Sequence, residues 1–198
     1  MFDSFKLTVY CVIIVFILYV IYSFKQQINK TVPSLFQNNT HWRCQHVPGD
    51  GSCFYHSVLY LLSKEYRKGD AEIRSQMPND LRLNLIKYVT PKIWDKKYSH
   101  IISYEKLHHN LLHAWAGNIE WCIVADYFKI NIIIIRDSSN SLYWGHDSIQ
   151  NDRKIIFIIN KEDIHFEPLV YKHSTSPYKE QYSFQYSKNI KRLLKKYK

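Results

Sequence analysis

Asp50-Gly51-Ser52-Cys53-Phe54-Tyr55 joins a tight polar turn to the start of an apolar helical pattern, and a cysteine stands at the junction. Much later in the chain, His165-Phe166-Glu167 places a histidine two positions before a carboxylate. A thiol, an imidazole and an acid are the groups that a cysteine nucleophile requires. We therefore expect Cys53 and His165 to lie together in the folded chain.

The turn before Cys53 favours thiol chemistry. A thiol attacks as its thiolate, so its pKa must be lowered, and a helix N-terminus supplies partial positive charge. Gly49 and Gly51 give the turn conformational freedom, and the backbone amides of residues 50–53 are placed to stabilise an oxyanion. The alternative is structural: Asp50 caps the helix and Cys53 is a small buried residue.

His165 and Glu167 follow a buried strand and a polar turn. In a strand, alternate side chains share one side, so Glu167 can hold the imidazole in its tautomer and orientation. The alternative is an exposed edge strand on which both side chains are solvated.

Hydrophobic periodicity predicts helices first and strands last, which is typical of an α+β or α/β layered domain. The expected helices begin at Cys53 and cover 78–89, 105–112 and 119–128. The expected strands cover 130–135, 155–159 and 165–171. Trp115 is expected in the core, on a loop between two helices.

An uncharged stretch of 18 residues, 7–24, precedes this domain. As a helix it would span about 27 Å, close to the roughly 30 Å of a bilayer core, and it is longer than the apolar region of a signal peptide. We expect a transmembrane helix and a single-pass membrane protein. Lys25 and Lys30 favour a cytosolic main domain, whereas the sequons at Asn29 and Asn38 would matter only on a luminal side.

The remaining boundaries follow from composition. Residues 1–6 form a short N-terminal segment, 25–40 a polar linker, 41–171 the domain and 172–198 a basic tail. Such a tail can bind anionic lipid or nucleic acid; we favour a solvated end and expect no nucleic-acid partner.

The cysteines and histidines do not indicate a metal site. Cys11, Cys44, Cys53 and Cys122 form no C-x-x-C pair, so neither a disulfide framework nor a zinc site is indicated. His108, His109 and His113 lie on a predicted helix without a nearby acidic motif, which disfavours a metal centre.

Taken together, the motifs resemble the OTU (ovarian tumour) family of cysteine proteases, which are deubiquitinases. The family's Asp-Gly-x-Cys motif with two large apolar residues is similar to residues 50–55. Its Trp-Gly-Gly-x-x-Glu motif is similar to residues 115–120, with Ala116 in place of the first glycine. Its His-aromatic-Asn/Asp motif is similar to residues 165–167, with glutamate in the third position.

The resemblance implies a papain-like α+β domain with a small central sheet flanked by helices, here preceded by the transmembrane helix. It implies Cys53 as nucleophile, His165 as general base and Glu167 as orienting acid, with Asp50 in the oxyanion loop. Because Glu167 is longer than the usual third residue, Asp50 or Asp163 is the alternative partner of His165. Neither a metal nor an organic cofactor is implied.

The implied substrate is ubiquitin, cleaved after its narrow Gly-Gly end in a slender channel gated by aromatic residues. Two alternatives stay open. The enzyme could act on another ubiquitin-like modifier or on a viral polypeptide. The domain could also be an inactive module that binds ubiquitin or tethers a partner at a membrane, although the intact Cys53 and His165 argue against this.

Overall fold

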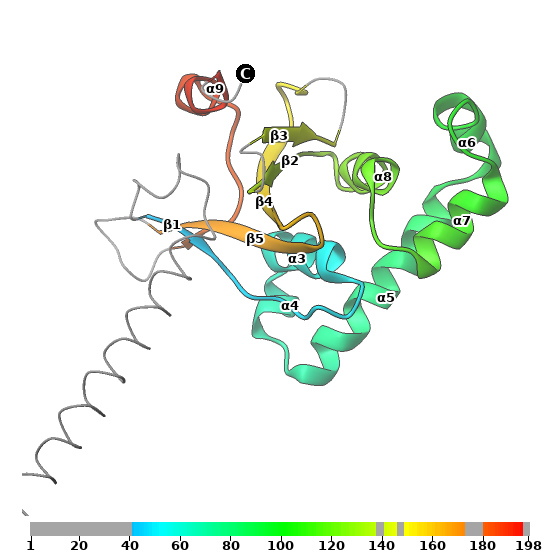
Figure 1. Cartoon of the computed structure of the whole chain (residues 1–198), viewed down its shortest axis with the longest axis horizontal. Helices are drawn as coiled ribbons and strands as arrows, with labels where there is room; N and C mark the ends of the chain where they lie inside the picture. Colours follow the sequence, from blue (N-terminus) through cyan, green and yellow to red (C-terminus); the bar gives the residue numbers. More distant parts are fainter. Residues whose placement is uncertain (1–40, 138–140, 146–148, 173–179, 196–198) are drawn as a thin grey trace, which may run out of the picture.

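The computed structural model describes residues 41–137, 141–145, 149–172 and 180–195 (Figure 1). Its helices are α3 (Cys53–Leu62), α4 (Lys64–Lys68), α5 (Ala71–Tyr88), α6 (Pro91–Lys97), α7 (Tyr104–His113), α8 (Asn118–Phe128) and α9 (Lys188–Lys195). Its strands are β1 (Trp42–Cys44), β2 (Ile130–Arg136), β3 (Ser141–Trp144), β4 (Lys154–Lys161), β5 (His165–Lys172) and β6 (Glu180–Gln181).

The strands form one mixed sheet in the order β1-β5-β4-β2-β3, and β6 also pairs with β5. β2 and β4 run parallel, and the other pairs are antiparallel. Strand β5 lies between β1 and β4: its first residues, from His165, pair with β4, and its later residues, Leu169 to Tyr171, pair with β1. The expected layered α+β architecture is confirmed.

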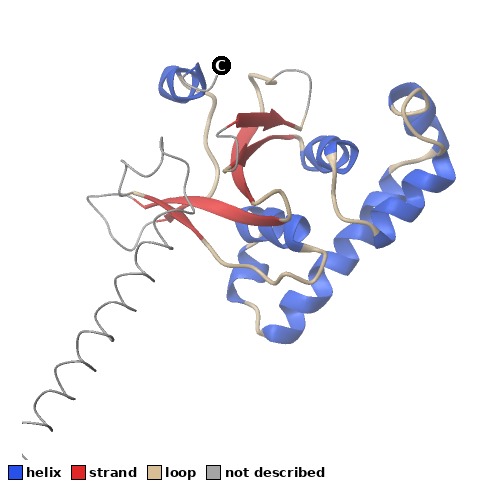
Figure 2. Ribbon diagram, viewed as in Figure 1, coloured by secondary structure: helices blue, strands red, loops and turns tan. Residues whose placement is uncertain are grey.

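Alternation along the isoleucine-rich strands divides the core between the two faces of the sheet. Ile132 and Ile134 pack on the side of α3, whereas Ile133 and Ile135 pack on the opposite side with Phe184. Figure 2 shows most helices grouped to one side of the strands, with α9 apart from them. A strand that is buried on both faces reads as a continuous apolar run, which explains the unbroken sequence of β2.

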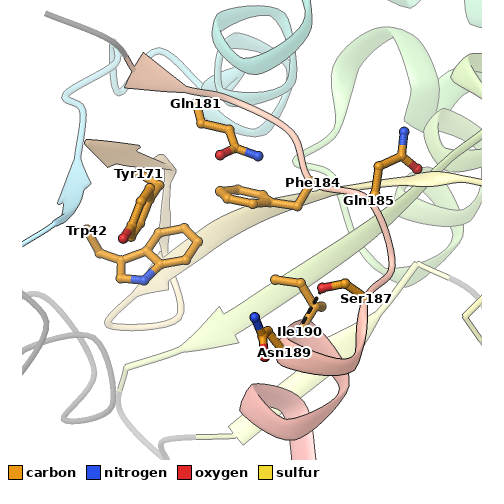
Figure 3. Close-up of a pocket in the computed structure, with 8 residues that line it drawn as sticks. All are labelled: Trp42, Tyr171, Gln181, Phe184, Gln185, Ser187, Asn189 and Ile190. Carbon is orange, nitrogen blue, oxygen red and sulfur yellow. Dashed lines mark hydrogen bonds between the residues drawn. The ribbon is translucent and has the colours of Figure 1, made fainter. Parts of the chain in front are cut away.

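The described part of the basic C-terminal segment, residues 180–195, belongs to this fold. β6 pairs with β5, and Phe184 exchanges backbone hydrogen bonds with Ile155. Ile190 and Leu194 of α9 are buried on the sheet, while Lys188, Lys191 and Arg192 are exposed. Phe184 and Ile190 also line an apolar pocket of about 460 Å³ beside Trp42 (Figure 3).

The start of helix α5 and the exposure of Trp115 differ from the sequence-based expectation. Helix α5 begins at Ala71, not at Pro78, because the Asp70 carboxylate caps it by accepting the Ile73 amide hydrogen at 2.9 Å. Pro78 therefore lies inside the helix and is buried there. The expectation that Trp115 lies in the core is wrong, since its side chain is 66% exposed.

The single-pass membrane localisation expected from the sequence is corrected, because the structure does not support it. Within residues 41–137, 141–145, 149–172 and 180–195, no helix has both the length and the apolarity to cross a bilayer. The longest, α5, has 18 residues but carries both acidic and basic side chains. The segments 1–6, 7–24 and 25–40, on which the expectation depended, lie outside the described residues.

The contacts of Phe184 predict that the C-terminal segment stabilises the domain. Phe184→Ala should lower the free energy of unfolding by about 3 kcal/mol, because a buried aromatic ring is lost from a packed cluster. Its ring lies 5.1 Å from that of Trp42 and 5.5 Å from that of Phe157. Gln185→Ala, at an exposed neighbour, should change it by less than about 0.5 kcal/mol. Urea denaturation measures both, and equal effects would contradict the prediction.

Candidate active site

Cys53 is the first residue of α3, and its side chain is almost buried. Ser52 is the N-cap residue, and its carbonyl accepts the first helical hydrogen bond from the His56 amide at 2.9 Å. Gly51 has a φ of 84°, a left-handed conformation that favours glycine. The sequence therefore places the thiol at the helix start as expected.

Helix α3 is fixed directly against the start of β5. The Ser57 hydroxyl lies 2.8 Å from the carbonyl oxygen of Cys53 and 3.1 Å from that of Phe166, so it bridges the two elements. The Phe54 ring packs edge-on against the Phe166 ring, with centroids 5.6 Å apart. The backbone of Phe166 in turn hydrogen-bonds the Cys53 thiol. The residue before Phe166 is His165, so the backbone of His165 lies next to this crossing.

The imidazole of His165 presents its two nitrogens to different neighbours. Nε2 lies 3.6 Å from Oε1 of Glu167, two positions along the same strand. The Nδ1 and Cε1 edge lies next to Gly49, on the turn that leads to Cys53. Burial lowers the pKa of His165, and the charges of His46 and Lys161 lower it further, while Glu167 opposes the shift. The ring is therefore neutral near pH 7 and can accept a proton.

The pKa of Cys53 is raised, which overturns the expectation of a lowered value. Burial is the main cause, and hydrogen bonds from the backbone of Phe166 and Phe54 counteract it in part. Cys53 is therefore a thiol at rest, and a nucleophilic role would require a base that accepts its proton. Cys44 is a weaker nucleophile still, because burial raises its pKa to about 12.

Asp50 holds the turn instead of capping the helix. Its Oδ1 accepts the Ser52 amide hydrogen at 2.9 Å, and its Oδ2 lies 2.9 Å from Nε2 of His56. His56 is buried, and its Nδ1 lies 2.7 Å from the Tyr66 hydroxyl. Burial raises the pKa of Asp50, but the hydrogen bonds from His56 and Ser52 outweigh it, so the net pKa is lowered. The Ser52 amide is thus committed to Asp50 and is not free for an oxyanion.

A buried arginine on α5 ties the same turn to the chain before α8. The Arg82 guanidinium donates to the carbonyl oxygens of Gly51 and Ala114, each at 3.1 Å, and to the Ser52 hydroxyl at 3.3 Å. It also stacks over the Tyr55 ring, 4.2 Å from the centroid. In the described part of the chain these partners are all uncharged. Arg82 was not anticipated, because a single arginine in a polar helical stretch carries no sequence signal.

Glu167 is buried, and its carboxylate lies close to three basic side chains. Lys161, from β4, forms an ion pair with Oε2, and Nδ1 of His46 lies 3.2 Å from Oε1. His165 is the third, at the longer distance of 3.6 Å. Neither His46 nor Lys161 was anticipated. The pairing of β4 with β5 brings Lys161 opposite His165, and a position in the sequence does not reveal that register.

The other expected candidates have different neighbours. Asp163 forms an ion pair with Arg136. His108 bonds the Val89 carbonyl, and His109 and His113 form a surface pair with ring centroids 5.1 Å apart. Among the residues that the structure describes, none of these three histidines belongs to a cluster of three possible metal ligands.

The chain before α8 borders the turn that precedes Cys53. The exposed Trp115 ring lies so close to Gly51 that a Cβ there would sit 3.4 Å from its Nε1. Two residues on, the Gly117 amide donates to the buried Glu120 carboxylate at 2.8 Å and closes the start of α8. An open pocket of about 560 Å³ has His46, Asp50 and His56 in its wall, but Cys53 and His165 are not among the residues that line it.

Comparisons with known proteins indicate the family and the fold of the chain. The family model of the OTU-like cysteine proteases matches residues 48–159, more than half of the chain. The matched range contains Asp50 and Cys53 but ends before His165 and Glu167. No curated protein sequence matches the chain significantly.

Solved structures of OTU domains are similar in fold. The OTU domain of OTUD1 has a TM-score of 0.53 and 18% identity, over 68% of this chain and 88% of that one. An OTU domain in complex with ubiquitin has a TM-score of 0.52 and 20% identity, over 78% and 81%. The Hazara virus OTU bound to ubiquitin has a TM-score of 0.45 and 20% identity, over 68% and 84%. The two structures with TM-scores above 0.5 show the papain-like α+β fold of OTU domains.

The charges around His165 predict that its pKa changes when the charge of Lys161 is removed. Lys161→Met should raise the pKa of His165, because a repelling cation is lost and Glu167 is freed to attract the proton. The imidazolium form should then persist to higher pH than in the wild type. NMR titration of the imidazole carbon-bound protons measures this. Lys154→Met, at an exposed lysine on the same strand, is the control, and an unshifted or lowered pKa in Lys161→Met would refute the prediction.

Proposed function

Because the chain belongs to the OTU-like cysteine protease family, we propose that it is a deubiquitinase with Cys53 as nucleophile, His165 as general base and Glu167 as the acid that orients the imidazole. The observation that carries the proposal is the crossing of α3 and β5. The Ser57 hydroxyl bridges the carbonyl oxygens of Cys53 and Phe166 there, and His165 stands one residue before Phe166.

In the proposed reaction, Nδ1 of His165 takes the proton from Sγ of Cys53, and the thiolate attacks the carbonyl carbon at the C-terminus of ubiquitin. The tetrahedral oxyanion is stabilised by backbone amides of the turn before α3. Since the Ser52 amide is bonded to Asp50, the Gly51 and Cys53 amides are the candidates. His165 then returns the proton to the leaving amine, and water hydrolyses the thioester.

Glu167 is the best-supported partner of His165. Its carboxylate lies 3.6 Å from Nε2, whereas Asp50 is engaged by His56 and Asp163 by Arg136. A proton held on Nε2 would leave the lone pair on Nδ1, on the edge of the ring that lies beside Gly49 and the turn before Cys53. Asp50 instead acts through the turn: the buried Tyr66–His56 pair fixes its carboxylate, and the carboxylate fixes the Ser52 amide.

Ubiquitin is the proposed substrate because the family consists of OTU-like cysteine proteases and a similar OTU domain was solved in complex with ubiquitin. The exposed Trp115 beside Gly51 fits an aromatic wall for a narrow peptide end that enters towards Cys53. A side chain beyond glycine would meet this wall, which favours a Gly-Gly terminus.

The nucleophile assignment is tested with the purified full chain, under reducing conditions, on a ubiquitin C-terminal fluorogenic substrate. Cys53→Ala should abolish turnover, while Cys44→Ala should retain it. Glu167→Gln should lower kcat by at least about tenfold, since proton transfer by a positioned base contributes roughly 10²–10⁴-fold. Turnover by Cys53→Ala would refute the assignment. An inactive but folded wild type would refute ubiquitin as the substrate, and parallel assays on other ubiquitin-like modifiers would then identify the target class.

The proposed wall predicts a specificity effect. Trp115→Ala should raise KM for the ubiquitin substrate roughly five- to tenfold, as truncating an aromatic anchor costs about 1–2 kcal/mol of binding. The melting temperature should change little, because the side chain is largely exposed. Ile101→Ala, also at an exposed apolar side chain, is the matched control. An unchanged KM in Trp115→Ala would exclude this residue from the substrate path.

A further inference from the structure

His46, His165 and Glu167 bring three potential metal-ligand atoms to one point beside the proposed base. One such atom from each residue lies within 4.8 Å of the other two. The Glu167 oxygen Oε1 is the common neighbour, 3.2 Å from Nδ1 of His46 and 3.6 Å from Nε2 of His165. Two imidazoles and one carboxylate are a ligand set that suits zinc.

The spacing fits a tetrahedral ion. Zinc–nitrogen and zinc–oxygen bonds of about 2.0–2.2 Å place the ligand atoms of a tetrahedral site about 3.3–3.5 Å apart. The two distances from Oε1 bracket this value. The two imidazole nitrogens lie within 4.8 Å of each other, and His46 can move to close the gap to a tetrahedral spacing because its side chain is 84% exposed. Water from that exposed side can fill the fourth position.

Two further features of the site favour the binding of a metal ion. Nε2 of His165 is buried and has no hydrogen-bond partner among the residues that the structure describes. A buried polar nitrogen without a partner is costly, and a metal ion would satisfy it. Lys161 pairs with Oε2 of Glu167, so the positive charge occupies the oxygen that a monodentate ion would not use.

We propose that this cluster binds one zinc ion and that zinc bound there reversibly inhibits the enzyme. The inhibition follows from the tautomer of His165. A metal on Nε2 takes that nitrogen's lone pair, so the proton of the neutral ring must reside on Nδ1. Nδ1 then has no lone pair to accept the Cys53 proton, and the thiolate cannot form. Zinc binding also engages Glu167, the proposed orienting acid.

Binding is measured on the full chain carrying Cys53→Ala, which removes the reactive thiol as a competing ligand. Competition with a chromophoric zinc chelator should give one ion per chain. Adding His46→Ala should weaken binding at least tenfold, because even the loss of a residue that only supports a ligand costs 10–100-fold. Adding His109→Ala instead, which disrupts the surface pair with His113, should leave this affinity unchanged.

Inhibition is measured on the chain with Cys53 intact and rests on the proposed function, unlike the binding measurement. Zinc should inhibit ubiquitin-substrate turnover, and a chelator should restore it. His46→Ala should need at least tenfold more zinc for half-inhibition, relative to its own zinc-free rate, and His109→Ala should match the wild type.

The outcomes separate the two proposals. Equal zinc affinity with and without His46→Ala, or loss of binding in Cys53→Ala alone, would overturn the site. Binding without inhibition of an active enzyme would overturn its inhibitory role. A chain that binds zinc as predicted but hydrolyses no ubiquitin substrate would leave the site standing and refute the proposed function instead.

Discussion

The site depends on the contact between the first turn of α3 and the first residues of β5. One hydroxyl, that of Ser57, reaches the carbonyl oxygens of both Cys53 and Phe166. Since a hydroxyl has a single proton, the two bonds are shared, and they hold only while helix and strand stay in register. The ring contact between Phe54 and Phe166 fixes the same crossing from the apolar side. Cys53, the proposed nucleophile, and His165, the proposed base, are neighbours of this crossing in the chain, so its register influences their separation.

Around this crossing, the turn before Cys53 is fixed by groups from three parts of the chain. His56 and Tyr66 hold the Asp50 carboxylate, and Arg82 holds the backbone at Gly51. Such supporting contacts keep catalytic groups in a defined geometry without contacting substrate. The raised pKa of Cys53 and the lowered pKa of His165 have the same main cause, which is burial. Burial favours the neutral form of both groups, so the proposed mechanism begins with proton transfer from the thiol to the imidazole.

Local patterns in the sequence were enough for four of the helices, for the strands β2, β4 and β5 and for part of the site, but not for α4, α6, α9, β1, β3 and β6. The β-branched runs predicted β2 and β4, and the position of Cys53 at a helix start followed from the glycine turn and the apolar spacing after it. Helix periodicity did not reveal where α5 begins, because Asp70 caps it well before the apolar repeat starts. The described part of the basic C-terminal segment packs on the sheet through Phe184 and α9. The high positive charge of the segment had instead favoured a solvated tail.

Residues that act through tertiary pairing could not be predicted. His46 and Lys161 reach Glu167 because β1 and β4 flank β5, and strand order is a property of the whole sheet. Asp50 was expected to cap the helix, but the buried His56 offers its carboxylate a better partner. The pKa of Cys53 was misjudged because helix position argues for a thiolate, whereas burial, visible only in the fold, argues more strongly for the thiol.

The uncharged partners of Arg82 have a consequence for how the enzyme responds to ionic strength. Dissolved ions screen interactions between exposed charges, but they act weakly on a buried guanidinium that donates to carbonyl oxygens and a hydroxyl. The conformation of the turn before Cys53 should therefore depend little on salt concentration. The ion pair between Glu167 and the partly exposed Lys161 is not insulated to the same degree. A change in salt concentration should therefore alter the electrostatic interactions of Glu167 and His165 more than the conformation of the turn before Cys53.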